Sequence, residues 1–194
     1  DYNETISNLF REQDILKIRQ FNIEKQKALM KICILGGNRM KFKNPMLVVT
    51  DIEKAKEFYK EVLGLRTIMD FGANVTLTGG VSLQTAETWA EFIHKGTDEI
   101  NFCGNDAELY FEEDEFDSFI EKLNSMENID YVHSVFEHRW GQRVVRFYDL
   151  DKHIIEVGES LKIVCKRFLD SGLTVEETAN RMDVPIKFVQ ACAR

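Results

Sequence analysis

At 194 residues, the chain is long enough for one well-filled hydrophobic core with appendages, or for two small domains. Acidic residues outnumber basic residues 33 to 25, which gives a net charge of -8. This excess of negative charge disfavours nucleic acid and membranes as partners, because both are polyanions. The sequence has no apolar run long enough to span a bilayer and no secretory leader, so we expect a cytoplasmic protein. No Cys-x-x-Cys pair occurs, which predicts reduced thiols at Cys33, Cys103, Cys165 and Cys192.

Residues 1–39 are charged and have apolar clusters at helical spacing. Gly36-Gly37-Asn38 interrupts this pattern just before Met40, where a segment with a different residue pattern begins. We interpret residues 1–39 as a helical N-terminal extension, residues 40–160 as a domain and residues 161–194 as a C-terminal helical tail. For the extension, an arm that covers apolar surface or pairs with another subunit is favoured over a coiled-coil remnant of a regulator.

From Asn44 onward the pattern indicates a strand, a helix and three further strands. The apolar run at 46–49 predicts the first strand, and a helix is expected to begin after Thr50 or Asp51, which are both good N-caps, and to end at Gly64. Three strands are then expected at 66–71, 74–78 and 81–85. Residues 86–104 carry mixed signals and are interpreted as a connection.

The same unit occurs again in the second half of the chain. A strand is expected at 107–112, then a helix after the acidic pair Asp114-Glu115, then strands at 131–137, 143–148 and 154–158. Shifting the first unit by 64 residues places Ile52 on Phe116 and Tyr59 on Leu123. A βαβββ unit that occurs twice predicts an α+β fold, in which paired βαβββ modules form a curved mixed sheet cup.

The last expected strand follows a hairpin made by the turn-forming run 149–153. Because side chains alternate along a strand, Glu156 points away from Ile155 and Val157, and hence away from the helices. The same alternation sends Ser82 to that open face. Four polar side chains are expected to meet there in one concavity: Asn44, Gln84, Glu108 and Glu156. Such a cup is the expected small-molecule site.

Two segments carry a resemblance to a known superfamily: Leu47-Val-Val-Thr-Asp-Ile-Glu-Lys-Ala-Lys-Glu-Phe-Tyr-Lys-Glu-Val-Leu-Gly-Leu65 and Phe147-Tyr-Asp-Leu-Asp-Lys-His-Ile-Ile-Glu-Val157. Together they closely resemble the vicinal oxygen chelate superfamily of glyoxalase I, bleomycin-resistance proteins, methylmalonyl-CoA epimerase and extradiol dioxygenases. The resemblance covers about residues 40–160 and implies a small-molecule ligand and a homodimer. Its metal-using members place four ligands on the first and last strand of each module, and these places fall on Asn44, Gln84, Glu108 and Glu156.

These four places depart from the glyoxalase pattern, which commonly has histidine at the first and third. Here those residues are Asn44 and Glu108, whereas Gln84 with Glu156 is similar to the epimerase arrangement. An all-oxygen set suits Mg, Ca or Mn better than Zn or Ni, which favour imidazole. The resemblance therefore implies one divalent cation, among Mn, Mg, Ni and Zn, and no organic cofactor.

The two carboxylates also admit an interpretation without metal. Glu108 and Glu156 repel each other in one cup unless they hold a cation, share a proton or pair with arginine, and Arg146 is placed to face them. A salt-bridged lining and a metal site are equally supported. The expected substrate contacts are Met46, Tyr110, His138, Trp140 and Arg146. Trp140, with cationic residues beside it, could bind a flat ring or an anion. A structural role, in which Trp140 covers the core or lies in a dimer interface, is slightly favoured.

The tail has the spacing of a helix at 161–169 followed by a helix-turn-helix at 174–190. Its last helix offers only Lys187 before Arg194, which is too little positive charge for a DNA-reading helix. We expect the tail to pack against the cup domain or to contribute to a dimer.

Two functions remain open. One is a divalent-metal lyase or isomerase of the glyoxalase or epimerase type, which moves a proton next to a carbonyl with the ion as Lewis acid. The other is a metal-free protein of the bleomycin-resistance type that sequesters a flat or cationic compound. An extradiol dioxygenase is disfavoured, because its iron requires histidines with a carboxylate. No catalytic residue is assigned.

Overall fold

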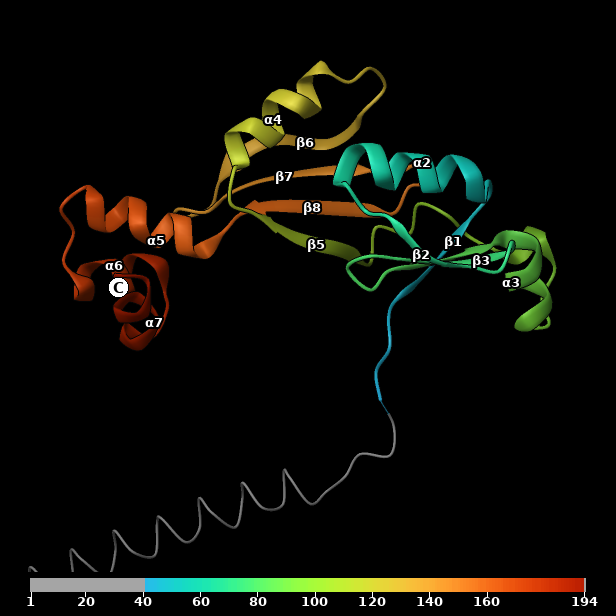
Figure 1. The fold of residues 1–194 in the computed structure, drawn as a ribbon, viewed down its shortest axis with the longest axis horizontal. Helices are drawn as coiled ribbons and strands as arrows, with labels where there is room; N and C mark the ends of the chain where they lie inside the picture. Colours follow the sequence, from blue (N-terminus) through green and yellow to red (C-terminus); the bar gives the residue numbers. More distant parts are fainter. Residues whose placement is uncertain (1–40, 194) are drawn as a thin grey trace, which may run out of the picture. The chain divides into compact units, whose positions relative to one another are not determined.

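The computed structural model describes residues 41–193 (Figure 1). The chain divides into two compact units, Asp1–Lys43 and Asn44–Arg194, and the second contains every helix and strand described below. The N-terminal extension expected at 1–39, with Cys33, lies outside the described residues.

The first module has the predicted order of one strand, one helix and three strands. Its elements are β1 (Met46–Val49), α2 (Ile52–Leu63), β2 (Thr67–Asp70), β3 (Asn74–Leu77) and β4 (Ser82–Thr85). The Asp51 side chain accepts a hydrogen bond from the Lys54 amide and begins α2, which ends at Gly64. The strands form a sheet in the order β1-β4-β3-β2, here called sheet A, with β1 and β4 parallel.

The second module repeats the first. Its elements are β5 (Glu108–Glu113), α4 (Phe116–Ser125), β6 (Asp130–Glu137), β7 (Arg143–Tyr148) and β8 (Ile154–Glu159). They form sheet B in the order β5-β8-β7-β6, with β5 and β8 parallel, so each strand takes the place of its counterpart in sheet A. The predicted α+β fold of paired βαβββ modules is confirmed.

The connection between the modules contains structure that the sequence pattern did not predict. Residues 86–104 hold α3 (Ala86–Phe92) and the short 3-10 helix η1 (Thr97–Glu99). The helix is only seven residues long, and its buried positions are two small residues, Ala86 and Ala90. Such a short, weakly patterned segment gives little helical periodicity to detect.

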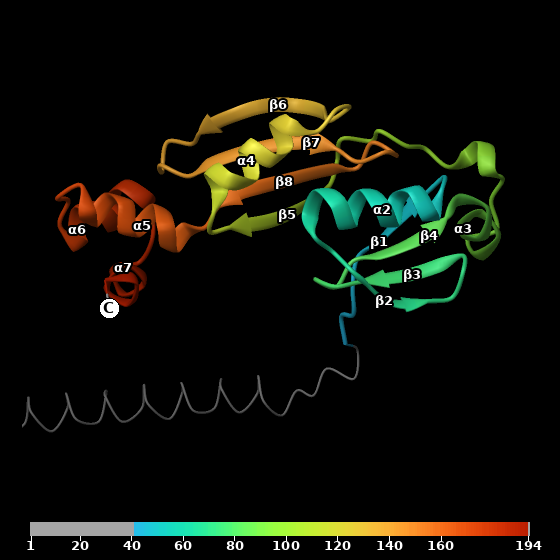
Figure 2. The same ribbon diagram turned by 45° about the horizontal axis from the view of Figure 1, so that its top comes forward.

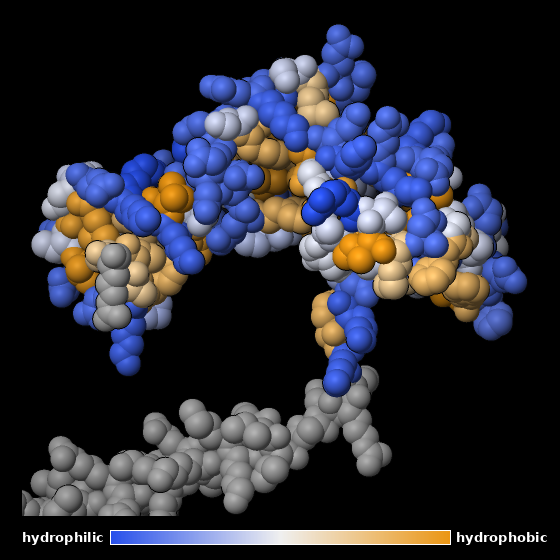
Figure 3. Space-filling model, viewed as in Figure 1, coloured by the Kyte–Doolittle hydropathy of each residue, from blue (hydrophilic) through white to orange (hydrophobic). Residues whose placement is uncertain are grey.

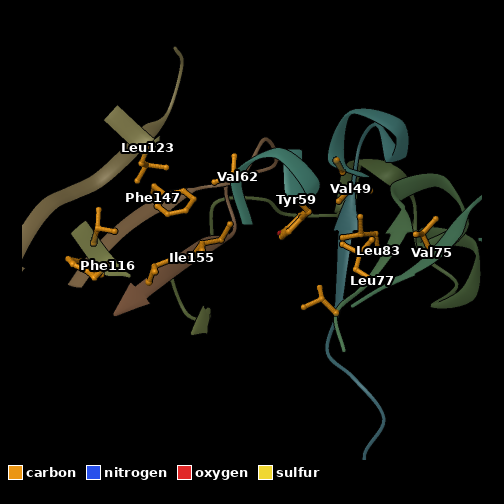
Figure 4. Close-up of a cluster of buried hydrophobic side chains, with 14 residues drawn as sticks. Val49, Tyr59, Val62, Val75, Leu77, Leu83, Phe116, Leu123, Phe147 and Ile155 are labelled. Carbon is orange, nitrogen blue, oxygen red and sulfur yellow. The ribbon is translucent and has the colours of Figure 1, made fainter. Parts of the chain in front are cut away.

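Helices α2 and α4 lie on the same side of the two sheets and cover a shared apolar core (Figures 1 and 2). Tyr59 and Val62 of α2 lie among side chains of both modules, including Phe147 and Ile155 of sheet B (Figure 4). The Tyr59 hydroxyl donates a hydrogen bond of 2.8 Å to Asp149 in the β7–β8 hairpin. Sheet B is therefore held to the helix of the first module by packing and by a buried polar contact.

The C-terminal tail folds into α5 (Leu161–Asp170), α6 (Val175–Met182) and α7 (Ile186–Cys192), close to the predicted bounds. These helices share a separate small core of Val164, Cys165, Ala179, Met182 and Val189. Hydrophobic surface gathers over these helices at the left of Figure 3. Within residues 41–193, no helix is both long and apolar enough to cross a membrane.

Candidate functional site

The open face of sheet B is the face turned away from the core, and it carries most of the predicted site. Val145 and Val157 point to the core, so Arg146 and Glu156, their neighbours in sequence, point the other way. The register pairs Arg146 on β7 with Glu156 on β8, and Glu156 with Tyr110 on β5. Three predicted site residues are thus side by side on three strands.

Arg146 joins the two predicted carboxylates. Its Nε donates to the Glu108 carboxylate at 2.8 Å, and its terminal nitrogen pairs with the Glu156 carboxylate. The Glu156 side chain is 8% exposed and the Glu108 side chain 38%, so one partner is buried and the other faces solvent. This arrangement is the salt-bridged lining that the sequence left open as an alternative to a metal site.

An aromatic row runs beside this salt bridge, from β6 into the β6–β7 loop. Its members are His133, Phe136, His138 and Trp140. The rings of His138 and Trp140 are stacked 4.0 Å apart with an interplanar angle of 10°. Arg146 Nη1 lies 3.3 Å from His133 Nε2, which connects the row to the carboxylates. The other neighbouring rings of the row meet edge to face, at 67° and 70°, so the row places four aromatic rings next to charge.

Gln142 fixes the loop that carries Trp140, although it was not among the predicted site residues. The Trp140 indole donates to the Gln142 side-chain oxygen at 3.1 Å, and the Gln142 amide donates to the Tyr110 hydroxyl and the Glu159 carbonyl, both at 2.9 Å. A Cβ at Gly158 would lie 2.9 Å from Gln142 Nε2, so only glycine leaves room for this amide. A polar residue between Trp140 and an apolar strand was the available sequence signal.

The remaining two predicted metal ligands lie in the first module and are engaged there. Asn44 Nδ2 donates to Ser82 Oγ at 2.5 Å. Gln84 accepts from Asn74 at 2.7 Å and donates to Thr88 of α3. Ser82 and Gln84 alternate with the core residues Val81 and Leu83, so they lie on the face turned away from the core, where each is 2% exposed. The predicted contact Met46 lies on β1 and is 43% exposed.

As placed, the four predicted ligands do not fit a divalent cation. Arg146 is already paired with both Glu108 and Glu156, and both amides are hydrogen-bonded within their own module. Across residues 41–193, no group of three or more His, Cys, Asp and Glu side chains is arranged to hold a metal ion. The metal site stays a prediction, and the side chains would have to rearrange to form it.

His138 gives the site a pH dependence. Desolvation lowers the pKa of His138 below its ordinary value of 6.5, and the charges of Arg146 and His133 act in the same direction. Because the folded state lowers this pKa, the contribution to stability is present above pH 6.5 and is lost as the pH falls through the folded value. We expect NMR titration to place the His138 pKa below 6.5 and to find it higher in the Arg146→Met variant. An equal pKa in both proteins would contradict the contribution of Arg146.

Comparison with known proteins places this fold in a family. The sequence profile of the glyoxalase-like domain matches residues 42–162, which is more than half of the chain. The chain belongs to the glyoxalase-like domain family. The resemblance to the vicinal oxygen chelate superfamily is thereby confirmed, and no curated protein matches the chain.

Solved structures similar to this glyoxalase-like protein have the same fold. A protein of unknown function from Agrobacterium tumefaciens is 34% identical, with a TM-score of 0.57, over 65% of this chain and 98% of that one. A hypothetical protein from S. aureus is 20% identical, with a TM-score of 0.55 and the same coverage. A glyoxalase/bleomycin resistance protein/dioxygenase from Nocardioides is 17% identical, with a TM-score of 0.53, over 69% of this chain and 92% of that one. Identities this low for the last two show the fold alone.

Proposed function

We propose that this glyoxalase-like protein binds a flat, cationic small molecule on the open face of sheet B without a metal ion. The observation that carries the metal-free part of the proposal is the pairing of Arg146 with both Glu108 and Glu156. The guanidinium lies between the two carboxylates, where a metal ion would have to bind, and its displacement would leave the buried charge of Glu156 without this partner.

The chemistry of the face supports a cationic aromatic ligand. Trp140 is half-buried and stacks one face on His138, and a Trp face attracts cations. Three carboxylates, Glu108, Glu112 and Glu156, lie on this face near the guanidinium of Arg146, so these four side chains together carry a net negative charge. Tyr110 adds a half-exposed ring, 48% accessible, next to these carboxylates.

The alternative function is a divalent-metal lyase or isomerase. For this activity a cation would have to displace Arg146 from Glu108 and Glu156 and recruit Gln84 and Asn44 from their present hydrogen bonds.

The superfamily resemblance also supports a homodimer that encloses the ligand between subunits, a cytoplasmic location, and no organic cofactor. Sedimentation of the full-length protein at several concentrations would test the dimer.

Ligand binding can be measured by titration calorimetry with ethidium as a flat cation and fluorescein as a flat anion. We expect ethidium to bind more tightly than fluorescein, because the face is acidic and aromatic. Trp140→Ala should weaken ethidium binding about tenfold through loss of stacking, whereas Trp89→Phe, in α3, should leave it unchanged. Equal binding of both dyes, or equal effects of both substitutions, would contradict the proposal.

A metal titration of the same protein separates the two functions. After treatment with a chelator, Mn, Mg, Ni and Zn are titrated into the wild type and into the Glu108→Ala and Glu156→Ala variants. Under our proposal, none of these metal ions binds to the wild type in a stoichiometric ratio that depends on both Glu108 and Glu156. Tight binding that both substitutions remove would instead favour the lyase or isomerase and would justify a screen of carbonyl and acyl-CoA substrates.

A further inference from the structure

We infer that the C-terminal helical module α5–α7 is part of the ligand site, because it positions the loop 138–142 that carries His138 and Trp140. The family profile ends at residue 162, so nearly the whole module lies beyond the matched region. The inference deepens the proposed function and rests on it for the identity of the ligand, whereas the effect of the module on the loop is measurable without ligand.

Arg167 of α5 makes the central contact. Its Nη2 donates to the Gly141 carbonyl in the loop and, at 3.0 Å, to the Glu159 carboxylate at the end of β8. The Glu159 side chain is 2% exposed and is also paired with Arg143 at 3.2 Å. Arg167 therefore fastens the tip of the loop to a buried anion in sheet B, where charge-assisted hydrogen bonds are strong.

Phe168, the next residue of α5, packs against the same loop. Gly141 has φ 89°, and a Cβ at this position would overlap the Phe168 ring. A glycine is thus required both by the backbone conformation and by the aromatic ring from the C-terminal module. The tip of the loop is closed by the hydrogen bond from the Gly141 amide to the His138 carbonyl, and α5 lies directly against it.

The contact continues from the loop tip to the ligand surface. Gly141 lies between Trp140 and Gln142, and Gln142 bonds Trp140, Tyr110 and the Glu159 backbone carbonyl. Arg167 contacts both the loop tip at Gly141 and the side chain of Glu159, the residue whose carbonyl Gln142 binds. Loss of Arg167 should free the loop and misplace the Trp140 ring, which lowers affinity through lost preorganisation.

The test compares Arg167→Ala with Lys166→Ala in the full chain. Lys166 precedes Arg167 in α5 and is exposed, and Lys166→Ala removes the same charge as Arg167→Ala. We expect Arg167→Ala to increase hydrogen exchange of loop 138–142 and to weaken ethidium binding, each about tenfold, because a charge-assisted hydrogen bond to the loop is lost. Arg167→Lys should restore part of both effects, since an ammonium can still donate to the Gly141 carbonyl. Lys166→Ala should change neither.

Loop exchange and ethidium affinity of Arg167→Ala that match those of Lys166→Ala would overturn the inference. If Arg167→Ala fails to fold, Phe168→Leu is read in the same way, because a smaller side chain loosens the contact with Gly141. If the wild type binds neither dye, the proposed ligand class is wrong, and the exchange rates alone decide whether the module positions the loop.

Discussion

Replacing Arg146 by methionine is expected to lower the free energy of unfolding by about 3 kcal/mol, because it leaves a buried carboxylate without its partner. The Glu156 side chain is 8% exposed, and Arg146 is the cation paired with it. Glu108 contributes less, because its side chain is 38% exposed and water can replace the guanidinium. Urea unfolding followed by circular dichroism gives the free energies of unfolding of the wild type and the variant.

Two further proteins show whether the effect of Arg146→Met comes from the unpaired charge. The double variant Arg146→Met with Glu156→Gln should recover much of the lost stability, because no buried charge remains. Lys152→Met removes an exposed pair with Asp130, whose side chains are 44% and 52% exposed, and should cost less than about 1 kcal/mol. Equal losses in Arg146→Met and Lys152→Met would show that the carboxylate of Glu156 reaches water.

Replacing Asp149 by alanine is expected to cost about 3 kcal/mol as well, for a different reason. The Asp149 carboxylate accepts hydrogen bonds from the Tyr59 hydroxyl, the amides of Asp151 and His153, and the His153 ring, at 2.8 to 3.0 Å. Its removal leaves several donors unpaired in a region where water enters poorly, at a cost of about 1–3 kcal/mol for each buried group. It also removes the polar contact that holds the β7–β8 hairpin to α2.

The comparison for Asp149→Ala is Asp130→Ala, which removes an exposed carboxylate from the neighbouring strand β6. We expect the unfolding midpoint in urea to fall strongly for Asp149→Ala and by little for Asp130→Ala. Tyr59→Phe should cost less than Asp149→Ala, because it removes only one of the donors. Similar midpoints for all three variants would mean that the carboxylate is replaced by water at little cost.

The order of the elements was largely predictable from the sequence, because it depends on local signals. Asp51 and Gly64 are the N-cap and C-cap of α2, as predicted. The apolar positions Ile52 and Tyr59 recur at Phe116 and Leu123, which predicted the second module. The alternation in β8 correctly predicted that Glu156 points away from the core. The exception was α3, which is too short to show a clear period.

The aromatic row could not be predicted by alternation. Register shifts occur in β6 between Tyr131 and His133 and again between His133 and Phe136. Each bulge adds a residue and reverses the faces that follow, so His133 and Phe136 share one face although they are three residues apart. Bulges depend on pairing with β7, which no local sequence signal describes.

By itself, the sequence determined the paired modules, their helices and the polar character of the open face, because caps, turns and periodicity act over a few residues. Only the tertiary structure decided which partners those polar side chains have. Arg146 reaches Glu108 across 38 residues of chain, and Arg167 reaches Gly141 across 26. Such pairings follow from the register of strands and the docking of the C-terminal helices, and they distinguish a salt-bridged face from four free metal ligands.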